Sequence, residues 1–530
     1  MLRHLIFLVA FLILLSCESS QEEKNESVDR LFLTDVSIPD DVKLSRALEK
    51  SFLKSLGLND QQQSAVINFY KANSFGFKHY SNNSMSKFGT MTEKCLTEPL
   101  QFGVPKSRLC QPKKDAHWIE KEIIMTSNLL TLGGTLKHGL IDFEQKKMRN
   151  IVPLDGKEFL EQCKQLDSLS IEELIIKQGI VDTNYQFLAQ HLYDFCQKYP
   201  LDTNSFQLKS KKEDPLLFEI NIKKSLISKG FLKSKSSEAE FNQSIKNFKR
   251  MCGFNEDSNI DEATLQALNE STYNKVVRAS IALDKLRQRK PDEKKFIRVN
   301  LPSFELFFIA DGALKSKNKV IIGKVSNQTP ELHARVNRIV CYPFWKVPQS
   351  IANKEILPAV RANSRYLSKN QYRIYRGTTE INPDSVSWRK YSKNFPYTVI
   401  QDPGPHNSLG IIKLEFYNSH NVYVHDTPSK SLFRKGFRSF SHGCMRCENP
   451  VELAKTILDF DSIRSTNRNI YVRDSIDSIL VRKINFSIPL KWSIPIYVEY
   501  ITVSATRDNL FFHLDLYRRE DEYIDLLRVA

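Results

Sequence analysis

The chain has 530 residues, of which 41% are hydrophobic and 26% are charged, and it contains no low-complexity tract. A chain of this length exceeds a single hydrophobic core, and its composition excludes a fibrous or largely disordered protein. The formal net charge of +16, with a pI near 9.2, favours contact with anionic surfaces such as wall polymers, lipid headgroups or nucleic acid, without choosing among them.

The N-terminus has the features of an export signal. Arg3 and His4 precede an unbroken apolar run over residues 5–15, which is too short to be a dedicated membrane span. The segment Leu14-Leu15-Ser16-Cys17 resembles the bacterial lipobox, whose cysteine is lipidated and becomes the mature N-terminus. Residues 1–17 are therefore predicted to be a lipoprotein signal peptide with Cys17 as the lipidation site, and an ordinary cleaved signal is the alternative.

A polar tether over residues 18–30 is predicted to lead into a helical scaffold domain over residues 31–212. Within the scaffold, apolar residues fall at helical spacing in two stretches, 171–178 and 184–199. Thr183 or Asn184 is the expected N-cap of the second helix. No group of chemically reactive residues gathers here, so we interpret this region as a scaffold.

Residues 213–273 are predicted to form a compact module of three short helices. Apolar residues repeat at helical spacing in two runs, Phe218, Ile222 and Leu226, then Phe241, Ile245, Phe248 and Cys252. Asp261 is expected to cap the third helix. This order resembles the peptidoglycan-binding-like module of bacterial wall enzymes, with a plain helical spacer as the alternative. A basic helix over residues 274–290 links the module to the next domain.

From residue 294 the hydrophobic period changes from helical to alternating. Strands are predicted over residues 296–300, 305–310 and 320–325, which begin a mainly β domain. An irregular stretch over about 350–400 follows. A segment of this length inside a compact domain usually serves as a lid or a binding loop.

The second half of this domain carries the reactive residues. A strand over residues 411–416 precedes another over 421–424, which delivers His425 at its end, where a base is rigidly mounted. A helix is predicted over residues 450–460. The C-terminal extension, residues 476–530, is again strand-like and is expected to pack on the β domain.

The hexapeptide Ser441-His442-Gly443-Cys444-Met445-Arg446 and the preceding His425 suit a thiol nucleophile and its base. A cysteine attacks carbonyls as a thiolate, so nearby histidines and cations that lower its pKa favour this role. Cys444 has His442, Arg446 and His425 as such neighbours. Gly443 allows a sharp turn that exposes backbone N–H groups, as an oxyanion hole requires.

Two other interpretations of the same residues stay open. Cys444-Met445-Arg446-Cys447 is also a C-x-x-C, which with His425 and His442 could hold zinc or act as a redox dithiol. No second C-x-x-C and no thioredoxin-like pattern accompanies it. In an oxidising compartment some of six other cysteines could form disulfides: Cys95, Cys110, Cys163, Cys196, Cys252 and Cys341. Of these, Cys95 and Cys110 are the closest pair in the sequence.

Several short segments in one order identify a family. They are residues 299–302, Gln328-Thr329-Pro330, Trp345-Lys346-Val347-Pro348, 404–410, His425-Asp426-Thr427-Pro428 and 441–446. The chain resembles the L,D-transpeptidases of bacterial peptidoglycan, of the large type with a helical scaffold and a lidded catalytic domain. The resemblance implies a multidomain α+β protein. Its mainly β catalytic domain would span residues 294–475, with a capping insert at about 350–400.

The resemblance also implies a cysteine acyltransferase reaction. Cys444 would attack the carbonyl of the third residue of a donor stem tetrapeptide and release D-alanine, with His425 as proton acceptor and donor. Backbone N–H groups near Gly443 would hold the oxyanion. Transfer to an amine of a neighbouring stem forms a 3→3 cross-link, and water as acceptor makes a carboxypeptidase. A lipoprotein that tethers membrane to peptidoglycan without turnover is a further alternative.

Supporting roles follow less directly from the resemblance. A backbone carbonyl beside His425 would orient the imidazole, which leaves Asp426 a structural role. The remaining site residues are expected to shape the pocket or contact substrate: Ser441, His442, Arg446, Tyr423 and Trp345. Cys447 lies outside the family motif and could pair with Cys444. No cofactor, metal or nucleic acid is implied. The implied partners are peptidoglycan stem peptides and, through the lipid anchor, a membrane facing the bacterial periplasm.

Overall fold

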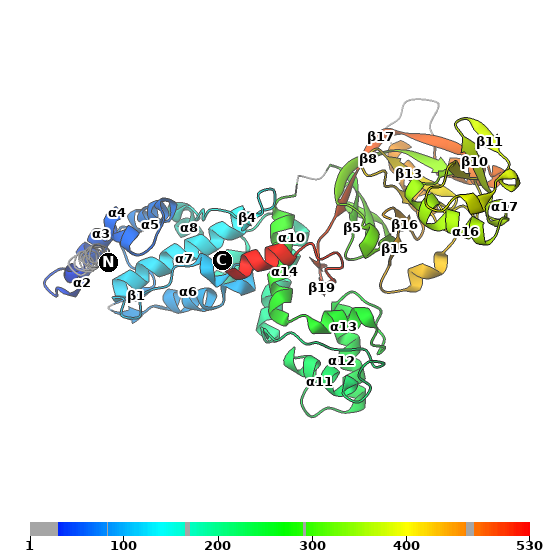
Figure 1. The fold of residues 1–530 in the computed structure, drawn as a ribbon. Coiled ribbons are helices and arrows are strands. Elements are labelled where there is room, and N and C mark those ends of the chain that lie inside the picture. The colour runs from blue at the N-terminus through cyan, green and yellow to red at the C-terminus, as the bar shows by residue number, and fades with distance from the viewer. Residues whose placement is uncertain (1–29, 82, 165–169, 290–292, 463–470, 530) are drawn as a thin grey trace, which may run out of the picture.

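The computed structural model describes residues 30–81, 83–164, 170–289, 293–462 and 471–529. The predicted signal peptide, Cys17 and nearly all of the tether lie outside these residues. Figure 1 shows an elongated molecule, with the helical scaffold at one end and the mainly β domain, here called the catalytic domain after its predicted role, at the other; the three-helix module lies beside their junction. None of the helices in the described part of the chain is both long enough and apolar enough to cross a bilayer.

The scaffold is built around α7 (Trp118–His138), a helix that is buried along most of its length. Asp182 caps α10, since its side chain accepts a hydrogen bond from the Tyr185 N–H, so the expected cap at Thr183 or Asn184 was wrong by one or two residues. The other elements are α2 (Leu31–Thr34), α3 (Asp40–Ala47), α4 (Lys50–Ser55), α5 (Asp60–Ala72), β1 (Tyr80–Ser81), β2 (Ser84–Met85), α6 (Lys87–Thr97), η1 (Pro99–Phe102), η2 (Lys106–Arg108), β3 (Ile141–Asp142), β4 (Lys147–Met148), α8 (Gly156–Cys163), α9 (Ile171–Ile176) and α10 (Thr183–Lys198).

The three-helix module contains α11 (Phe218–Ser228), α12 (Glu238–Met251) and α13 (Glu262–Asn269) around a small core of its own. Asp261 caps α13 by accepting from the Thr264 N–H, as predicted. The next helix, α14 (Thr272–Arg287), is more than a linker. Most of it is buried, because it packs against α10 on one side and against the C-terminal part of the chain on the other.

The catalytic domain is a nine-stranded sheet in the order β15-β7-β16-β14-β13-β8-β17-β5-β6, and β7 also pairs with β6. The three strands expected at its start form, and the third begins seven residues earlier than expected, at Ala313. Helix α18 (Pro450–Ser462) covers the sheet. The strands are β5 (Lys295–Asn300), β6 (Glu305–Ala310), β7 (Ala313–Gly323), β8 (Leu332–Cys341), β13 (Ile412–Phe416), β14 (Val424–His425), β15 (Ser439–Ser441), β16 (Met445–Cys447) and β17 (Phe486–Glu499), and a short helix η3 (Val325–Asn327) follows β7.

The C-terminal extension does not simply pack on this domain. Strand β17 lies inside the sheet, antiparallel to β8 and parallel to β5. Two helices that the strand-like pattern did not predict are also present, α19 (Arg473–Arg482) and α20 (Asp521–Val529). Residues 500–529, here called the C-terminal tail, contain the hairpin β18 (Val503–Ala505) and β19 (Leu510–Phe512) and end with α20 beside α14 (Figure 1).

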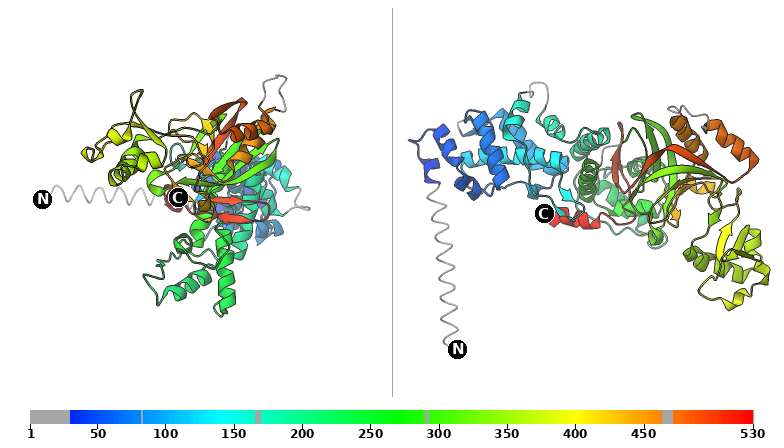
Figure 2. Two further views of the ribbon diagram at one scale, coloured as in Figure 1. Left: turned by 90° about the vertical axis from the view of Figure 1, so that its right-hand side faces the viewer. Right: turned by 90° about the horizontal axis from the view of Figure 1, so that it is seen from above.

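The stretch expected to be irregular is a folded capping subdomain, residues 345–401, with its own hydrophobic core around Trp388. It projects from the far end of the catalytic domain (Figure 2). Its four-stranded sheet has the order β11-β10-β12-β9. The elements are β9 (Trp345–Lys346), α15 (Gln349–Ile351), the π-helical turn η4 (Ala352–Ile356), α16 (Leu357–Ala362), α17 (Tyr366–Lys369), β10 (Tyr372–Arg376), β11 (Thr379–Ile381), η5 (Pro383–Ser385), η6 (Trp388–Lys390) and β12 (Thr398–Gln401), and a further short helix, η7 (Lys430–Arg434), lies outside it.

Candidate active site

The candidate thiol and its base project from one face of two neighbouring strands. Strands β14 and β16 are parallel, and their register pairs His425 with Arg446. Because side chains alternate along a strand, Cys444, two residues before Arg446, shares the face of His425 and Tyr423. A strand spacing of about 4.8 Å and a rise of about 3.3 Å per residue place the Cα atoms of Cys444 and His425 roughly 8 Å apart. Their side chains are therefore within reach of a common substrate.

His425 is held as a neutral imidazole. Its Nδ1–H donates to the backbone carbonyl of Asp426 at 2.5 Å, which leaves Nε2 as the unprotonated nitrogen. Burial, together with the charge of the nearby Arg446, lowers the pKa of His425 to about 3, although the hydrogen bond to the Asp426 carbonyl opposes this shift. A neutral imidazole with a free Nε2 can accept a proton from a thiol.

Asp426 braces the backbone rather than the imidazole. Its carboxylate accepts a hydrogen bond from the Ile411 N–H at 3.0 Å and pairs with Lys430 at 2.5 Å. Gly410 has a φ of +59°, and a Cβ there would lie 2.2 Å from an Asp426 carboxylate oxygen. The glycine of the 404–410 segment is thus required by this close approach, and the carboxylate has no place in a Cys-His-Asp triad.

The thiol of Cys444 has a raised pKa, which contradicts the expectation from its sequence neighbours. Burial is the largest cause; hydrogen bonds from the backbone and side chain of Tyr423, followed by the charges of Lys413 and Arg446, lower the pKa only in part. The Sγ lies 4.0 Å from the carbonyl oxygen of Asn421. The resting pair is therefore a neutral thiol beside a neutral imidazole, in which the base acts only when substrate is attacked.

The backbone around the thiol, residues 441–444, is here called the nucleophile loop. The Ser441 hydroxyl donates to the Cys444 carbonyl at 2.5 Å and accepts from the Gly443 N–H at 3.1 Å. Gly443 has a φ of +118°, a backbone conformation that residues other than glycine rarely adopt. Thr329 donates to the Gly443 carbonyl at 2.8 Å. Thr329 belongs to the family segment Gln328-Thr329-Pro330, but the sequence predicted no role for its side chain.

His442 points away from the thiol and toward the capping subdomain. Its Nε2 lies 2.5 Å from a carboxylate oxygen of Glu355, on the π-helical turn η4. Both side chains are substantially exposed, so this pair joins the cap to the nucleophile loop at the surface. Nothing in the sequence singled out Glu355, since a single π-helical turn has no residue pattern of its own.

The two candidate lining aromatics lie against each other, since a hydrogen bond from the Trp345 side chain acts to lower the pKa of Tyr423. Trp345, on β9, packs against the core of the capping subdomain. Tyr423 lies beside the thiol under Lys413, whose Nζ is 4.3 Å from the ring centroid, and its pKa is raised by burial and by Cys444. Burial lowers the pKa of Arg446, which lies close enough to Cys444 and Glu355 for both to counteract that effect.

Cys447 lies on the opposite face of β16 from Cys444. It is fully buried with Met445 in the core, and burial raises its pKa to about 12. Because the two thiols face opposite ways, a Cys444–Cys447 disulfide would require the strand to be rebuilt. All eight cysteines of the described residues are unpaired, Cys95 and Cys110 included. Within the same residues, no three His, Cys, Asp or Glu side chains are grouped closely enough to hold a metal ion.

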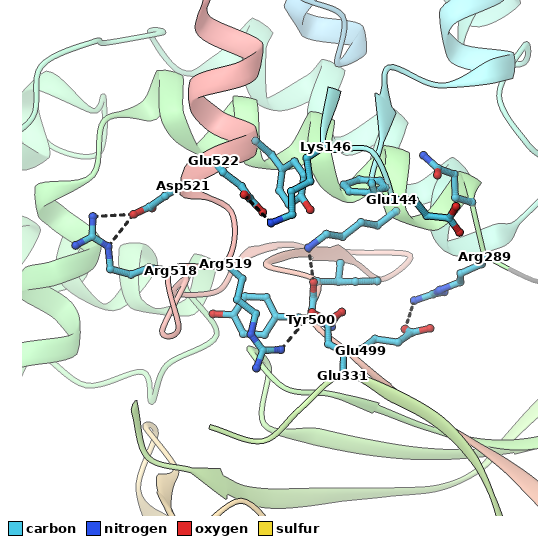
Figure 3. Close-up of a pocket in the computed structure, with 15 residues that line it drawn as sticks. Glu144, Lys146, Arg289, Glu331, Glu499, Tyr500, Arg518, Arg519, Asp521 and Glu522 are labelled. Atoms are coloured by element: carbon cyan, nitrogen blue, oxygen red, sulfur yellow. Dashed lines mark hydrogen bonds and ion pairs between the residues drawn. The ribbon is translucent and has the colours of Figure 1, made fainter. Parts of the chain in front are cut away.

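A cavity of about 880 Å³ lies away from the thiol, between the β3–β4 hairpin, α14 and the C-terminal tail. Figure 3 shows that its charged side chains pair with one another, for example Lys146 with Glu522 and Arg289 with Glu499. These pairs belong to a joint between the scaffold and the catalytic domain. This cavity contains none of the predicted site residues, and Cys444 and His425 lie elsewhere, on the β domain.

Comparison with known proteins gives similarities in the part of the chain that contains these residues. Residues 294–469 match the family model described as the L,D-transpeptidase catalytic domain. A putative L,D-transpeptidase of Haemophilus influenzae is 30% identical over 228 residues, which are 43% of this chain and 45% of that protein. The chain thus matches less than half the length of this curated relative.

Solved structures of the same description are more distant. An L,D-transpeptidase from Mycobacterium smegmatis is 12% identical, with 39% of this chain and 58% of that chain covered, at a TM-score of 0.18. One from Stackebrandtia nassauensis is 11% identical, with 57% and 96% covered, at a TM-score of 0.18. The sequence matches therefore carry the comparison: residues 294–469 are similar to the L,D-transpeptidase catalytic domain and to the curated relative.

Proposed function

We propose that this protein is a peptidoglycan L,D-transpeptidase that forms 3→3 cross-links. The observation that supports this most directly is the state of His425. Its Nδ1–H is fixed on the Asp426 carbonyl, so its free Nε2 faces the same side of the sheet as the Cys444 thiol. This arrangement suits acyl transfer by a thiol that is deprotonated during attack.

In the first half-reaction, Cys444 Sγ attacks the carbonyl carbon of the third stem residue while His425 Nε2 takes the thiol proton. The carbonyl oxygen gains the negative charge and is stabilised by backbone N–H groups of the nucleophile loop. Collapse of this intermediate breaks the peptide bond to D-alanine. His425 returns its proton to the leaving amine, and a thioester remains on Cys444.

In the second half-reaction, an amine of a neighbouring stem attacks the thioester carbonyl and His425 accepts the proton of that amine. Sγ leaves as a thiolate and is reprotonated, so the site returns to its resting state. The cap would cover the donor stem during these steps and limit the access of water. Arg446, a half-buried cation near the thiol, is suited to a carboxylate of the stem.

The test is incubation of the full chain with tetrapeptide muropeptides. We expect 3→3 dimers and free D-alanine from the wild type, and neither product from Cys444→Ala. Cys447→Ala is the matched control, because it removes a thiol on the other face of the same strand. It should keep the activity, whereas a redox dithiol would lose its function with either cysteine.

Three other results would overturn the proposal. D-alanine without dimers would make the protein a carboxypeptidase that uses water. Neither product, together with sedimentation on sacculi, would favour a tether that binds peptidoglycan without turnover. Stoichiometric zinc in the purified protein, lost in Cys444→Ala and Cys447→Ala alike, would favour the metal site.

The proposed substrate lies outside the cytoplasm, so we also propose that the chain is exported and anchored through lipidated Cys17 in the periplasm. The basic, apolar and lipobox-like order of residues 3–17 supports this. Metabolic labelling with a tagged fatty acid tests it. The label should appear in the wild type and be lost in Cys17→Ala, and labelling that persists in Cys17→Ala would contradict the anchor.

A further inference from the structure

The orientation of one peptide unit in the nucleophile loop is set by Thr329. The Thr329 hydroxyl, fully buried, donates to the Gly443 carbonyl at 2.8 Å and accepts from the Gly323 N–H at 2.9 Å. In a planar trans peptide the carbonyl of Gly443 and the N–H of Cys444 point in opposite directions. Holding this carbonyl therefore turns the Cys444 N–H away from the buried side of the loop.

The Cys444 N–H is an amide of this loop that remains available, and it belongs to the nucleophile itself. The Gly443 N–H already donates to the Ser441 hydroxyl at 3.1 Å, and the Met445 N–H donates to the Tyr423 carbonyl at 3.0 Å. Within the part of the chain that the structure describes, the Cys444 N–H has no hydrogen-bond acceptor. A free amide on the nucleophile itself is a suitable donor to an oxyanion.

The C-terminal tail holds Thr329 in place. The hydroxyl of Tyr517 donates to the Gly323 carbonyl at 2.5 Å and accepts from the Thr329 N–H at 3.2 Å. Arg519 donates to the Thr329 carbonyl at 2.8 Å. Tyr517 is buried and stacked on Tyr500, with the ring centroids 5.6 Å apart. These bonds fix both the backbone and the side chain of Thr329.

The C-terminal tail is in turn fixed to helix α14. The Tyr517 N–H donates to the Tyr500 hydroxyl at 2.8 Å, and Lys285 of α14 donates to the Tyr500 carbonyl at 2.7 Å. Lys285 also pairs with the buried Glu520 at 2.9 Å. Figure 3 shows Tyr500 and Arg519 in the wall of the charged cavity at this joint. The contacts thus run from α14 through the C-terminal tail to the nucleophile loop.

We propose that Thr329 and Tyr517 are positioning residues that aim the Cys444 N–H at the oxyanion. The C-terminal tail is then part of the apparatus that orients the active site, although its residues touch no substrate. This inference rests on the proposed acyl transfer and deepens it. It predicts that loss of either hydroxyl slows reactions that pass through a tetrahedral oxyanion and spares reactions of the same thiol that do not.

Two reactions of Cys444 separate these cases. Release of D-alanine from tetrapeptide muropeptide needs an oxyanion, whereas alkylation by iodoacetamide does not. We expect Thr329→Val to lower kcat for D-alanine release about 100-fold, the typical loss for one oxyanion donor. Tyr517→Phe, which acts one bond further away, should lower it about 3-fold to 10-fold. In both variants KM and the alkylation rate should stay near wild type.

Two controls keep the test specific. Thr329→Ser retains the hydroxyl and should restore most of the rate lost in Thr329→Val. Tyr185→Phe removes a buried tyrosine hydroxyl in the scaffold, bonded to Arg287 at 2.8 Å, and should change neither reaction. A general loosening of the fold would instead lower alkylation and D-alanine release together.

The outcomes distinguish the inference from the function on which it rests. If the wild type releases no D-alanine, the proposed function fails and this inference fails with it. If the wild type is active and Tyr517→Phe and Thr329→Val release D-alanine at the wild-type rate, the inference alone is overturned. A parallel loss of alkylation in both variants would also overturn it, since the effect would then be on the thiol or on the fold.

Discussion

The nucleophile loop is fixed by contacts on two sides. The contacts with the C-terminal tail are here called the inner hold, those with the capping subdomain the outer hold, and the two differ in kind. On the inner side, the C-terminal tail reaches it through two buried hydrogen bonds, from the Thr329 N–H to the Tyr517 hydroxyl and from the Thr329 hydroxyl to the Gly443 carbonyl. On the outer side, the capping subdomain reaches it through a contact between His442 Nε2 and a carboxylate oxygen of Glu355, whose side chains are 32% and 50% exposed.

Burial decides what each contact contributes. A buried polar group that loses its partner costs about 1–3 kcal/mol, because water cannot replace the bond. An exposed ion pair contributes about 0–1 kcal/mol and weakens with salt. We therefore infer that the inner hold fixes the position of the nucleophile loop, whereas the outer hold would permit the cap to move relative to it. The predictions below test this division, beginning with the largest expected effect.

The inner hold depends on Gly443, and Gly443→Ala should reduce D-alanine release about 100-fold. No atom lies closer than 3.7 Å to a Cβ at this position, so the loss arises from the φ of +118° and not from crowding. Relaxing that strain moves the loop, and a shift of about 1 Å at a catalytic group costs about 100-fold. The measurement is kcat with muropeptide substrate.

Gly312→Ala is the matched control, because Gly312 has a φ of +70° and open space around it, in the turn between β6 and β7. It should lower the melting temperature to a similar degree but leave kcat unchanged. If both variants lost activity equally, the effect would be one of stability, and the inner hold would have no special place in catalysis.

The tail should detach when its buried charges are broken. Arg278 on α14 is fully buried, pairs with Glu270 at 2.6 Å and donates to the His513 carbonyl at 2.6 Å. Arg278→Met leaves Glu270 with Lys275 alone, and we expect a loss of about 3 kcal/mol. Hydrogen exchange of the tail amides measures it. Arg250→Met, at an exposed pair with Glu256, is the control and should leave the exchange of the tail amides unchanged.

The same pairs make the tail sensitive to acid. Burial opposes ionisation of Glu270, but Arg278 and Lys275 prevail and lower its pKa from 4.5 to about 2. A carboxyl with a depressed pKa stabilises the fold above its unfolded pKa, and the stability is lost as the pH falls from about 4.5 to 2. The loss is on the order of 3 kcal/mol. Tail protection should fall over this range in the wild type and much less in Arg278→Met.

The sequence predicted what is encoded locally. Cys444, Gly443 and His425 stand in short contiguous segments, and the alternation before His425 placed it at the end of a strand, as found. Asp261 could be predicted as an N-cap because its helix begins at the next residue, Glu262. The contacts of Thr329 with Tyr517 could not be predicted, since they exist only because β17 enters the middle of the sheet and carries the tail back to the loop.

The pKa of the thiol shows a different limit. From the sequence, the neighbours His442 and Arg446 predicted a low value, but His442 faces Glu355 and burial of Cys444 outweighs the remaining charges. Burial is a property of the whole fold, so the sign of the shift could not be read from the motif. Glu355 could not be predicted either, because it is distant from His442 in the sequence and only the fold brings the two side chains together.

The raised pKa has a direct test. The rate of Cys444 alkylation by iodoacetamide should rise with pH with a midpoint above 9, and at pH 7 it should be slower than that of a free cysteine. His425, with a pKa of about 3, stays neutral over this range and adds no second transition. Lys413→Met removes one lowering charge and should move the midpoint higher. A midpoint below 8 would indicate a thiolate–imidazolium pair and contradict the neutral resting state.

The outer hold should show the smallest effect. Glu355→Gln keeps the shape of the side chain and removes its charge, so we expect D-alanine release to change less than about threefold. The effect of the wild-type pair should fade as salt is raised, since both partners are exposed. Muropeptide kinetics at low and high salt measure this. If Glu355→Gln cost as much as Thr329→Val, the cap would be fixing the nucleophile loop as firmly as the tail does. The division between a rigid inner hold and a loose outer one would then be wrong.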